Sequence, residues 1–117
     1  MATRRAGRAA PVHDLGAIQQ AAAAGRVTWQ DSVTDDLVKY EYTVDEVLKC
    51  LQALEARHFS TTKDYQDGKG PFDVYHIPWH HHIQSQNRVV VEKLYIKLKL
   101  TQRGRAAFML SFHPADF

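Results

Sequence analysis

The chain has 117 residues, enough for one domain with a single hydrophobic core. Its 15 basic and 13 acidic residues and its 44% hydrophobic content are typical of a soluble globular protein, and no apolar run reaches the roughly 18 residues of a membrane-spanning helix. The chain has one cysteine, Cys50, which excludes an internal disulfide and a zinc site built from cysteines. We therefore expect a cytoplasmic protein. We expect Cys50 to be a small buried residue.

Order and charge vary along the chain. Residues 1–10 are rich in alanine and arginine, and we expect a disordered basic tail there, with residues 11–117 forming a single domain. Acidic residues outnumber basic ones between positions 26 and 57, whereas from 88 to 113 six lysines and arginines accompany Glu92 alone. This asymmetry favours a basic face for a polyanion, and the alternative is a solvated sheet whose charges maintain solubility.

Three helices are expected in the N-terminal half. The first is "VHDLGAIQQAAAAG", which ends at Gly25, and the second and weaker one is "VTWQDSVTDDLVKY", for which Thr28 is the expected cap. The strongest pattern is "YTVDEVLKCLQALEARHF", in which Thr43 and Glu46 form a capping box. The apolar stripe of this third helix contains Val44, Val47, Leu48, Leu51 and Leu54.

After Phe59 the apolar period changes to two, which predicts strands. The segments "STTKDYQD" and "FDVYHI" flank the turn "DGKGP" and predict a hairpin; Pro78 is expected to end its second strand, and "PWHHHIQSQN" to form a polar loop. A long strand over residues 89–100 is followed by the turn "TQRGR" and the strand "AAFMLSFH". The order predicts an α+β fold with N-terminal helices packed on one face of a twisted antiparallel sheet.

The last two strands carry polar chemistry on one face. The stretch "KLYIKLKL" alternates, so that one side carries Leu94, Ile96, Leu98 and Leu100 and the other carries Tyr95, Lys97 and Lys99. On the following strand we expect Phe108, Leu110 and Phe112 to face the helices and Met109, Ser111 and His113 to face outward. Such a face suits RNA cleavage without a metal, because histidine transfers protons near neutral pH, lysine stabilises a phosphorane, and tyrosine donates a hydrogen bond or stacks on a base.

Short motifs in a fixed order connect this face with a known family. They are Pro11, Leu15 and Ile18 before "GRV"; "YEYTVDEVLKCLQAL" followed by Phe59; Tyr65; "DVY" at Asp73 to Tyr75; "LYIKL"; and a closing "SFH". In this order the chain resembles the MqsR family of bacterial toxins over about residues 11 to 113. Members of that family are RelE-like mRNA interferases that an MqsA-type antitoxin holds inactive.

The resemblance implies a RelE-like toxin of a type II toxin–antitoxin system that cleaves mRNA by 2′-hydroxyl attack, without a metal or another cofactor. Tyr95 falls on the active-site tyrosine of the family, and His113 falls where a basic residue follows "SF". Lys63 is the nearest match to the lysine after the third helix, because Ser60 stands at the ungapped position. With these candidate catalytic residues we expect RNA contacts from Lys97, Lys99, Arg103 and Arg105.

Two other classes of function remain open. Phe72 stands where the family has a glutamine, which favours a catalytically inactive RelE-like fold that binds RNA or a protein partner. A metal-dependent protein is the third class, since His76 precedes the run His80, His81 and His82. Neighbouring side chains of an extended segment diverge, so we expect no metal site; Trp79 and the histidines are alternatively placed to stack on RNA bases.

Overall fold

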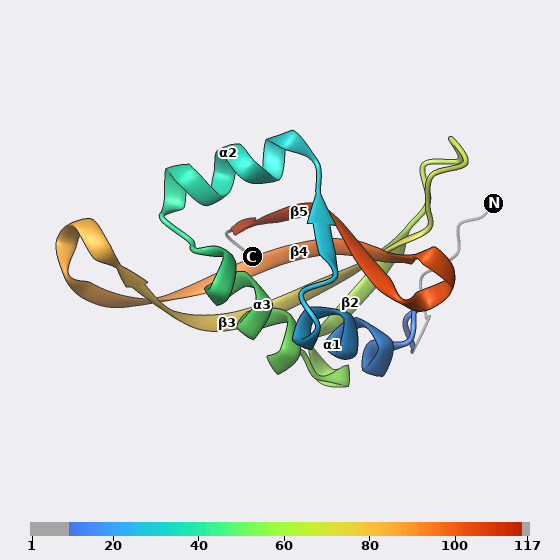
Figure 1. The fold of residues 1–117 in the computed structure, drawn as a ribbon, viewed down its shortest axis with the longest axis horizontal. Coiled ribbons are helices and arrows are strands. Elements are labelled where there is room, and N and C mark those ends of the chain that lie inside the picture. The colour runs from blue at the N-terminus through green and yellow to red at the C-terminus, as the bar shows by residue number, and fades with distance from the viewer. Residues whose placement is uncertain (1–9, 116–117) are drawn as a thin grey trace.

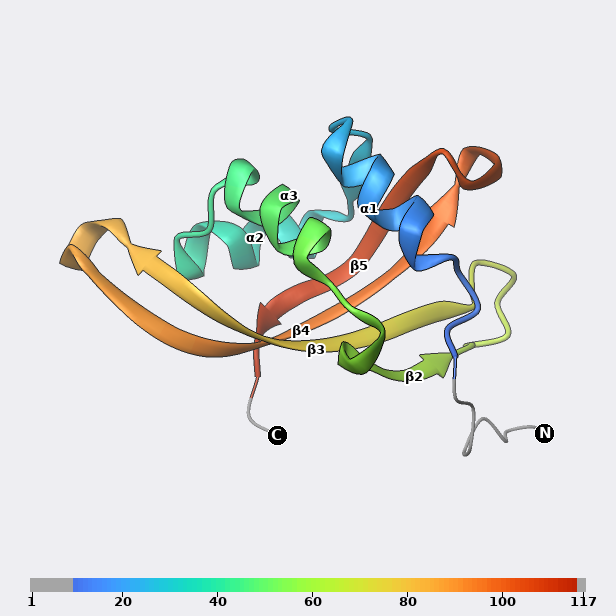
Figure 2. The ribbon, with the colours of Figure 1, turned by 90° about the horizontal axis from the view of Figure 1, so that it is seen from below.

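Three helices cover one face of a five-stranded sheet in the computed structural model, which describes residues 10–115 (Figures 1 and 2). The helices are α1 (Leu15–Ala23), α2 (Asp31–Tyr40) and α3 (Val44–Ala53). The strands are β1 (Val27–Trp29), β2 (Phe59–Lys63), β3 (Phe72–Ile83), β4 (Arg88–Thr101) and β5 (Ala106–Pro114), in the sheet order β1-β5-β4-β3-β2. The predicted α+β class with helices on one face is confirmed. The tail predicted for residues 1–10 lies, except for Ala10, outside the described residues.

The sheet is mixed, so the prediction of an antiparallel sheet is wrong at one edge. The segment Val27–Trp29 was predicted to be helical but forms β1, which pairs in parallel with β5 and places Trp29 opposite Met109. Valine, threonine and tryptophan favour strands, and pairing with β5 adds the hydrogen bonds that a short isolated helix lacks. The following helix has Gln30, not Thr28, at its N-cap.

The third helix begins as predicted, with half of the expected capping box. The Thr43 hydroxyl accepts a hydrogen bond from the Glu46 amide at 3.1 Å. The Glu46 carboxylate does not return to the cap; it accepts from Trp79 Nε1 at 3.0 Å and contacts His81 Nδ1 at 2.9 Å. This carboxylate therefore connects α3 to β3. Val44, predicted in the apolar stripe, is 54% exposed.

Strand β3 continues where a polar loop was predicted. It pairs with β4 from Asp73 opposite Leu98 to Ile83 opposite Arg88, and the two strands form a long arm in Figure 1. Pro78 does not end the strand, because pairing with β2 extends only to Tyr75 and proline is tolerated on an edge.

A bulge in β5 changes which of its side chains face the helices, compared with the prediction. Lys97 pairs with Ser111, but the next pair is Leu98 with Met109, so Leu110 is the extra residue. Met109 is therefore in the core, whereas Phe108 and Leu110 lie on the side away from the helices, contrary to prediction. Phe112 is in the core as expected.

The core lies between the helices and the sheet. Fully buried members include Ile18, Val33, Val47, Leu51 and Leu54 from the helical layer and Tyr75, Leu94, Ile96, Leu98, Met109 and Phe112 from the sheet. Burial raises the pKa of the Cys50 thiol, which agrees with the prediction of a small buried residue. In residues 10–115, no helix has the length and apolar content to cross a membrane.

Candidate active site

The side of the sheet opposite the helices, here called the outer face, carries three rings in register. His76 of β3 pairs with Tyr95 of β4, which pairs with His113 of β5. The Tyr95 ring centroid lies 5.6 Å from that of His76, with the planes tilted by 37°, and 5.4 Å from that of His113, nearly parallel at 17°. We call His76, Tyr95 and His113 the aromatic row.

Buried neighbours fix the direction of this row. Leu94 and Ile96 flank Tyr95 and are fully buried against the helices, so the alternation of β4 points Tyr95 to the outer face. Tyr75 and Ile77 flank His76 and are also buried, so the alternation of β3 points His76 to the outer face. All three side chains of the row belong to residues that are only partly buried, so the row is partly exposed on the outer face.

The environment of His76 favours its neutral form. Burial of the imidazole, and then the charge of Lys63, hold the pKa of His76 below its ordinary value of 6.5. A neutral imidazole at pH 7 has one nitrogen lone pair that can accept a proton. His76 therefore has the charge state of a general base.

Hydrogen bonding defines the proton arrangement of His113. Its Nδ1 lies 2.9 Å from the backbone oxygen of Pro114. A carbonyl oxygen only accepts, so Nδ1 carries the proton in this contact, and Nε2 is the ring nitrogen that does not take part in it.

Lys97 adds positive charge beside the row. Its Nζ lies 5.9 Å from the centroid of the Tyr95 ring and donates to the Tyr65 hydroxyl at 2.6 Å. Tyr65 belongs to the segment between β2 and β3 and is 50% exposed. The Lys97 ammonium is thus held where it can meet a phosphate at the row.

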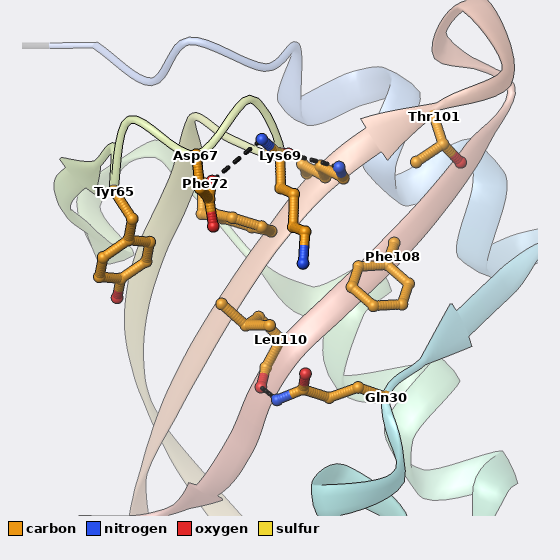
Figure 3. Close-up of a pocket in the computed structure, with 9 residues that line it drawn as sticks. Gln30, Tyr65, Asp67, Lys69, Phe72, Thr101, Phe108 and Leu110 are labelled. Atoms are coloured by element: carbon orange, nitrogen blue, oxygen red, sulfur yellow. Dashed lines mark hydrogen bonds between the residues drawn. The ribbon is translucent and has the colours of Figure 1, made fainter.

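A cavity of about 450 Å³ adjoins this group on the outer face (Figure 3). We call it the outer pocket, and its lining includes Tyr65, Asp67, Lys69, Phe72, Lys99 and Phe108. Lys99 Nζ lies 5.4 Å from the Phe72 ring centroid and 6.0 Å from that of Phe108, and it donates to the Lys69 backbone oxygen. Since Tyr65 lines the pocket and also binds Lys97, the pocket and the row form one continuous surface.

The structure brings together some of the residues predicted from sequence. Tyr95 and His113 are neighbours in the row, Lys97 is adjacent, and Lys99 lies in the outer pocket. Lys63 of β2 pairs with Phe72 of β3, and its positive charge helps to lower the pKa of His76.

Arg103 and Arg105 are not part of this group. They lie in the turn between β4 and β5, beyond the end of β4 at Thr101. Thr101 is six residues further along the strand than Tyr95, which is about 20 Å.

Sequence reasoning missed three contributors to this surface. His76 was considered only together with the later histidines, as a metal site that we did not expect, although the alternation of "FDVYHI" places it opposite to Tyr75 and Ile77. Phe108 was assigned to the core, and the bulge at Leu110 carries no signal in the apolar period. Tyr65 was noted only for the family resemblance.

The other histidines of β3 do not converge. His81 is fully buried, with Nδ1 against Glu46 and Nε2 2.7 Å from the Tyr40 backbone oxygen, whereas His82 contacts Asn87 and Gln84 at the exposed end of the arm. Across residues 10–115, no three His, Cys, Asp or Glu side chains are arranged to hold a metal ion.

No protein-family model matches the chain, and a search of curated proteins gives no match. The family resemblance therefore depends on the short motifs, and the chemistry depends on the geometry of the outer face.

Proposed function

We propose that the chain is a metal-independent endoribonuclease that cleaves mRNA, with a RelE-like domain acting as the toxin of a type II toxin–antitoxin system. One observation carries this proposal: two histidines flank Tyr95 on an open sheet face, beside the ammonium of Lys97. Tyr95 lies between the two histidines in the strand order, so a phosphodiester held over Tyr95 would have one histidine on each side.

The first step is removal of a proton from the ribose 2′-hydroxyl. We assign this step to His76, because its lowered pKa keeps the imidazole neutral at pH 7. The 2′-oxygen then attacks the adjacent phosphorus and forms a bond to it, while His76 holds the proton.

The second step is departure of the 5′-oxygen. As an imidazolium, His113 keeps its Nδ1 proton on the Pro114 oxygen and gives the proton on Nε2 to the leaving oxygen as the P–O5′ bond breaks. The products are a 2′,3′-cyclic phosphate and a 5′-hydroxyl.

Lys97 and Tyr95 stabilise the charge that develops between the histidines. The Lys97 ammonium is held by Tyr65 beside the row, where it offsets the negative charge of the phosphorane. The Tyr95 hydroxyl donates to a phosphate oxygen, or its ring supports a base by stacking. The proposed attacking group is the ribose 2′-hydroxyl, which DNA lacks, so the proposed substrate class is RNA.

As a toxin of this class, the enzyme would be held inactive by a protein inhibitor. We propose a cognate MqsA-like antitoxin that covers the outer face with an acidic segment, since Lys97 and Lys99 present positive charge there. Occupation of this face blocks the row without any change in the fold.

The test is cleavage of a long unstructured mRNA by purified protein in EDTA. We expect discrete fragments with 5′-hydroxyl ends. RNA that is bound in a salt-sensitive way but never cut contradicts the proposal and supports the RNA-binding alternative.

A further inference from the structure

We propose that the free edge of β4 in the arm is an interaction surface for a second copy of the chain. Figure 1 shows β3 and β4 extending past the end of β5. Strand β5 pairs with β4 only as far as Pro114 opposite Leu94. The Ala115 amide then donates to the Lys93 oxygen at 2.9 Å. Residues 88–92, here called the arm edge, pair with β3 on one side, and within residues 10–115 no strand pairs with them on the other.

The backbone of the arm edge presents hydrogen-bonding groups on its free side. In an antiparallel ladder the N–H and C=O of a residue point to the same side, and the side alternates along the strand. The Lys93 oxygen points away from β3, because it accepts from Ala115. Pro78, the residue opposite Lys93, has no N–H to offer it. The pairing with β3 continues along the arm edge without a register shift, so the N–H and C=O of Val91 and Val89 also point to the free side.

The side chains of the arm edge favour pairing with another strand. The sequence is "RVVVE", and its consecutive valines have high strand propensity. Val89 and Val91 are 60% and 63% exposed, whereas Val90 between them is half-buried. An exposed edge strand with apolar side chains is a template for another strand, and this segment contains neither a lysine nor a proline that would prevent pairing.

One antiparallel register makes the arm edge its own complement. With Val90 opposite Val90 of a second copy, Val89 lies opposite Val91 of that copy. Arg88 then lies opposite Glu92 of the second copy, and the two-fold symmetry repeats both pairs. This register also lets Val89 and Val91 exchange their N–H···O bonds across the edge.

Neighbouring registers lack this match. A centre at Val89 places Arg88 opposite Val90, and a centre at Val91 places Glu92 opposite Val90. A centre at Arg88 or at Glu92 places like charges directly opposite each other, which destabilises a strand pair. The register centred on Val90 is therefore the one that we propose.

The charged ends of the arm edge have atoms left for this pairing. Glu92 accepts from the Tyr42 hydroxyl through Oε1, and Oε2 is the oxygen that this bond does not use. Arg88 donates from Nε to Gln86 Oε1 at 2.7 Å, and its two terminal amino groups can still donate to a carboxylate. This charge complementarity between two identical segments favours a second copy over an unrelated partner.

Pairing of this kind joins the sheets of two copies into one. Residues directly opposite each other on antiparallel strands point to the same face, so the outer faces of both copies lie on the same side. Tyr95 lies beyond the arm edge, so both aromatic rows stay uncovered. The paired segment is short and its interface falls below the roughly 1,000 Å² of a stable complex, so we expect a weak, reversible dimer.

The test is sedimentation equilibrium of the full chain at concentrations from about 1 to about 200 µM, where a weak dimer forms by mass action. We expect the mass to rise from the 13.4 kDa of one chain towards twice that value as the concentration increases. A mass of one chain throughout this range overturns the proposal.

Val91→Lys with Val38→Lys as its control locates the interface. Val38 lies on α2 and is 75% exposed, so each variant adds one positive charge at an exposed valine. A lysine on an edge strand opposes pairing, so we expect Val91→Lys to weaken association about tenfold or more and Val38→Lys to leave it unchanged. Equal association of the two variants overturns the assignment to the arm edge.

Arg88→Glu and Glu92→Arg test the register. Each variant alone places like charges opposite each other, so we expect monomers, whereas an equimolar mixture restores opposite charges at both ends and forms a dimer. Circular dichroism establishes that each variant is folded. A mixture of folded variants that stays monomeric, or association of Arg88→Glu as strong as that of wild type, overturns the register centred on Val90.

Two variants keep the test decisive if Glu92→Arg does not fold after losing the Tyr42 bond. Arg88→Glu and Val91→Lys change exposed residues, and their association is then compared with that of wild type. Cleavage of mRNA does not enter these measurements, so the failure of the dimer or of the nuclease leaves the other proposal intact.

Discussion

His76 and His81 lie five residues apart on β3 and have opposite environments. His81 is fully buried under α3, stacks on Tyr42 at 3.8 Å, and has an acceptor at each ring nitrogen. His76 points to the outer face, is only partly buried, and lies beside Tyr95. The comparison teaches that strand parity places His81 in the core and His76 on the outer face of the same strand.

The largest expected effect is on cleavage by the row. His76→Ala or His113→Ala removes one of the two groups to which we assign proton transfer, so we expect a loss of about 100-fold or more in cleavage rate. His82→Ala is the control, since this exposed histidine lies at the end of the arm. Rates are measured on one mapped site in EDTA with unchanged melting temperature. A row variant as active as His82→Ala removes that histidine from the mechanism.

His81→Ala is expected to affect stability rather than chemistry. It leaves the Glu46 carboxylate and the Tyr40 carbonyl, on the helical side of the sheet, without their imidazole partner. We expect this loss to lower the free energy of unfolding by about 3 kcal/mol. Thermal unfolding monitored by circular dichroism should show a melting temperature lower by about 10 °C. His76→Ala is the comparison, and equal destabilisation of the two variants argues against the structural role of His81.

These histidines also show what sequence predicts and what it does not. The alternation of β4 predicted correctly that Tyr95 and Lys97 face outward. A strand with one apolar face has only one register that buries that face, so its other side chains must point away from the core. The arm was missed, because the partners that hold β3 there, Glu46 and Tyr40, are more than 30 residues away in sequence. No local pattern records such a contact.

Two further errors have the same origin in tertiary pairing. The segment at Val27–Trp29 became a strand because β5 was available to pair with it in parallel. The bulge at Leu110 exchanged the faces of Met109 and Phe108, so two residues that line the outer pocket, Phe108 and Leu110, were assigned to the core. The alternation of β4 alone was enough to predict that Tyr95 faces outward. The outer pocket is lined by five separate segments, so it was harder to predict from sequence than the position of Tyr95.

Lys97→Ala should produce a smaller change than loss of a histidine. It removes one phosphate contact beside the row, so we expect about tenfold slower cleavage and a salt dependence of RNA binding reduced by about one charge. Lys49→Ala is the control, since that lysine pairs with Asp45 on the helical side. An unchanged salt slope indicates that Lys97 does not contact phosphate.

The smallest expected effect is a shift in pH dependence. The lowered pKa of His76 keeps its basic form down to a pH below 6.5, so the acid limb of the wild-type rate profile should have its midpoint below that value. Lys63→Met removes one cause of the lowering, and the midpoint moves to higher pH by a few tenths of a unit, with little change at pH 8. Lys39→Met on α2 should leave the profile unchanged, and a downward shift in Lys63→Met contradicts the assignment of His76 as base.

The most direct test of the central claim is a chimeric RNA with a single 2′-deoxyribonucleotide at a mapped cleavage site, incubated with wild-type protein in EDTA. Attack by the 2′-hydroxyl predicts that this site is no longer cut, while the protein still binds the RNA and cuts other sites. Continued cleavage at the deoxyribonucleotide contradicts the account, because the row would then not act through the 2′-hydroxyl.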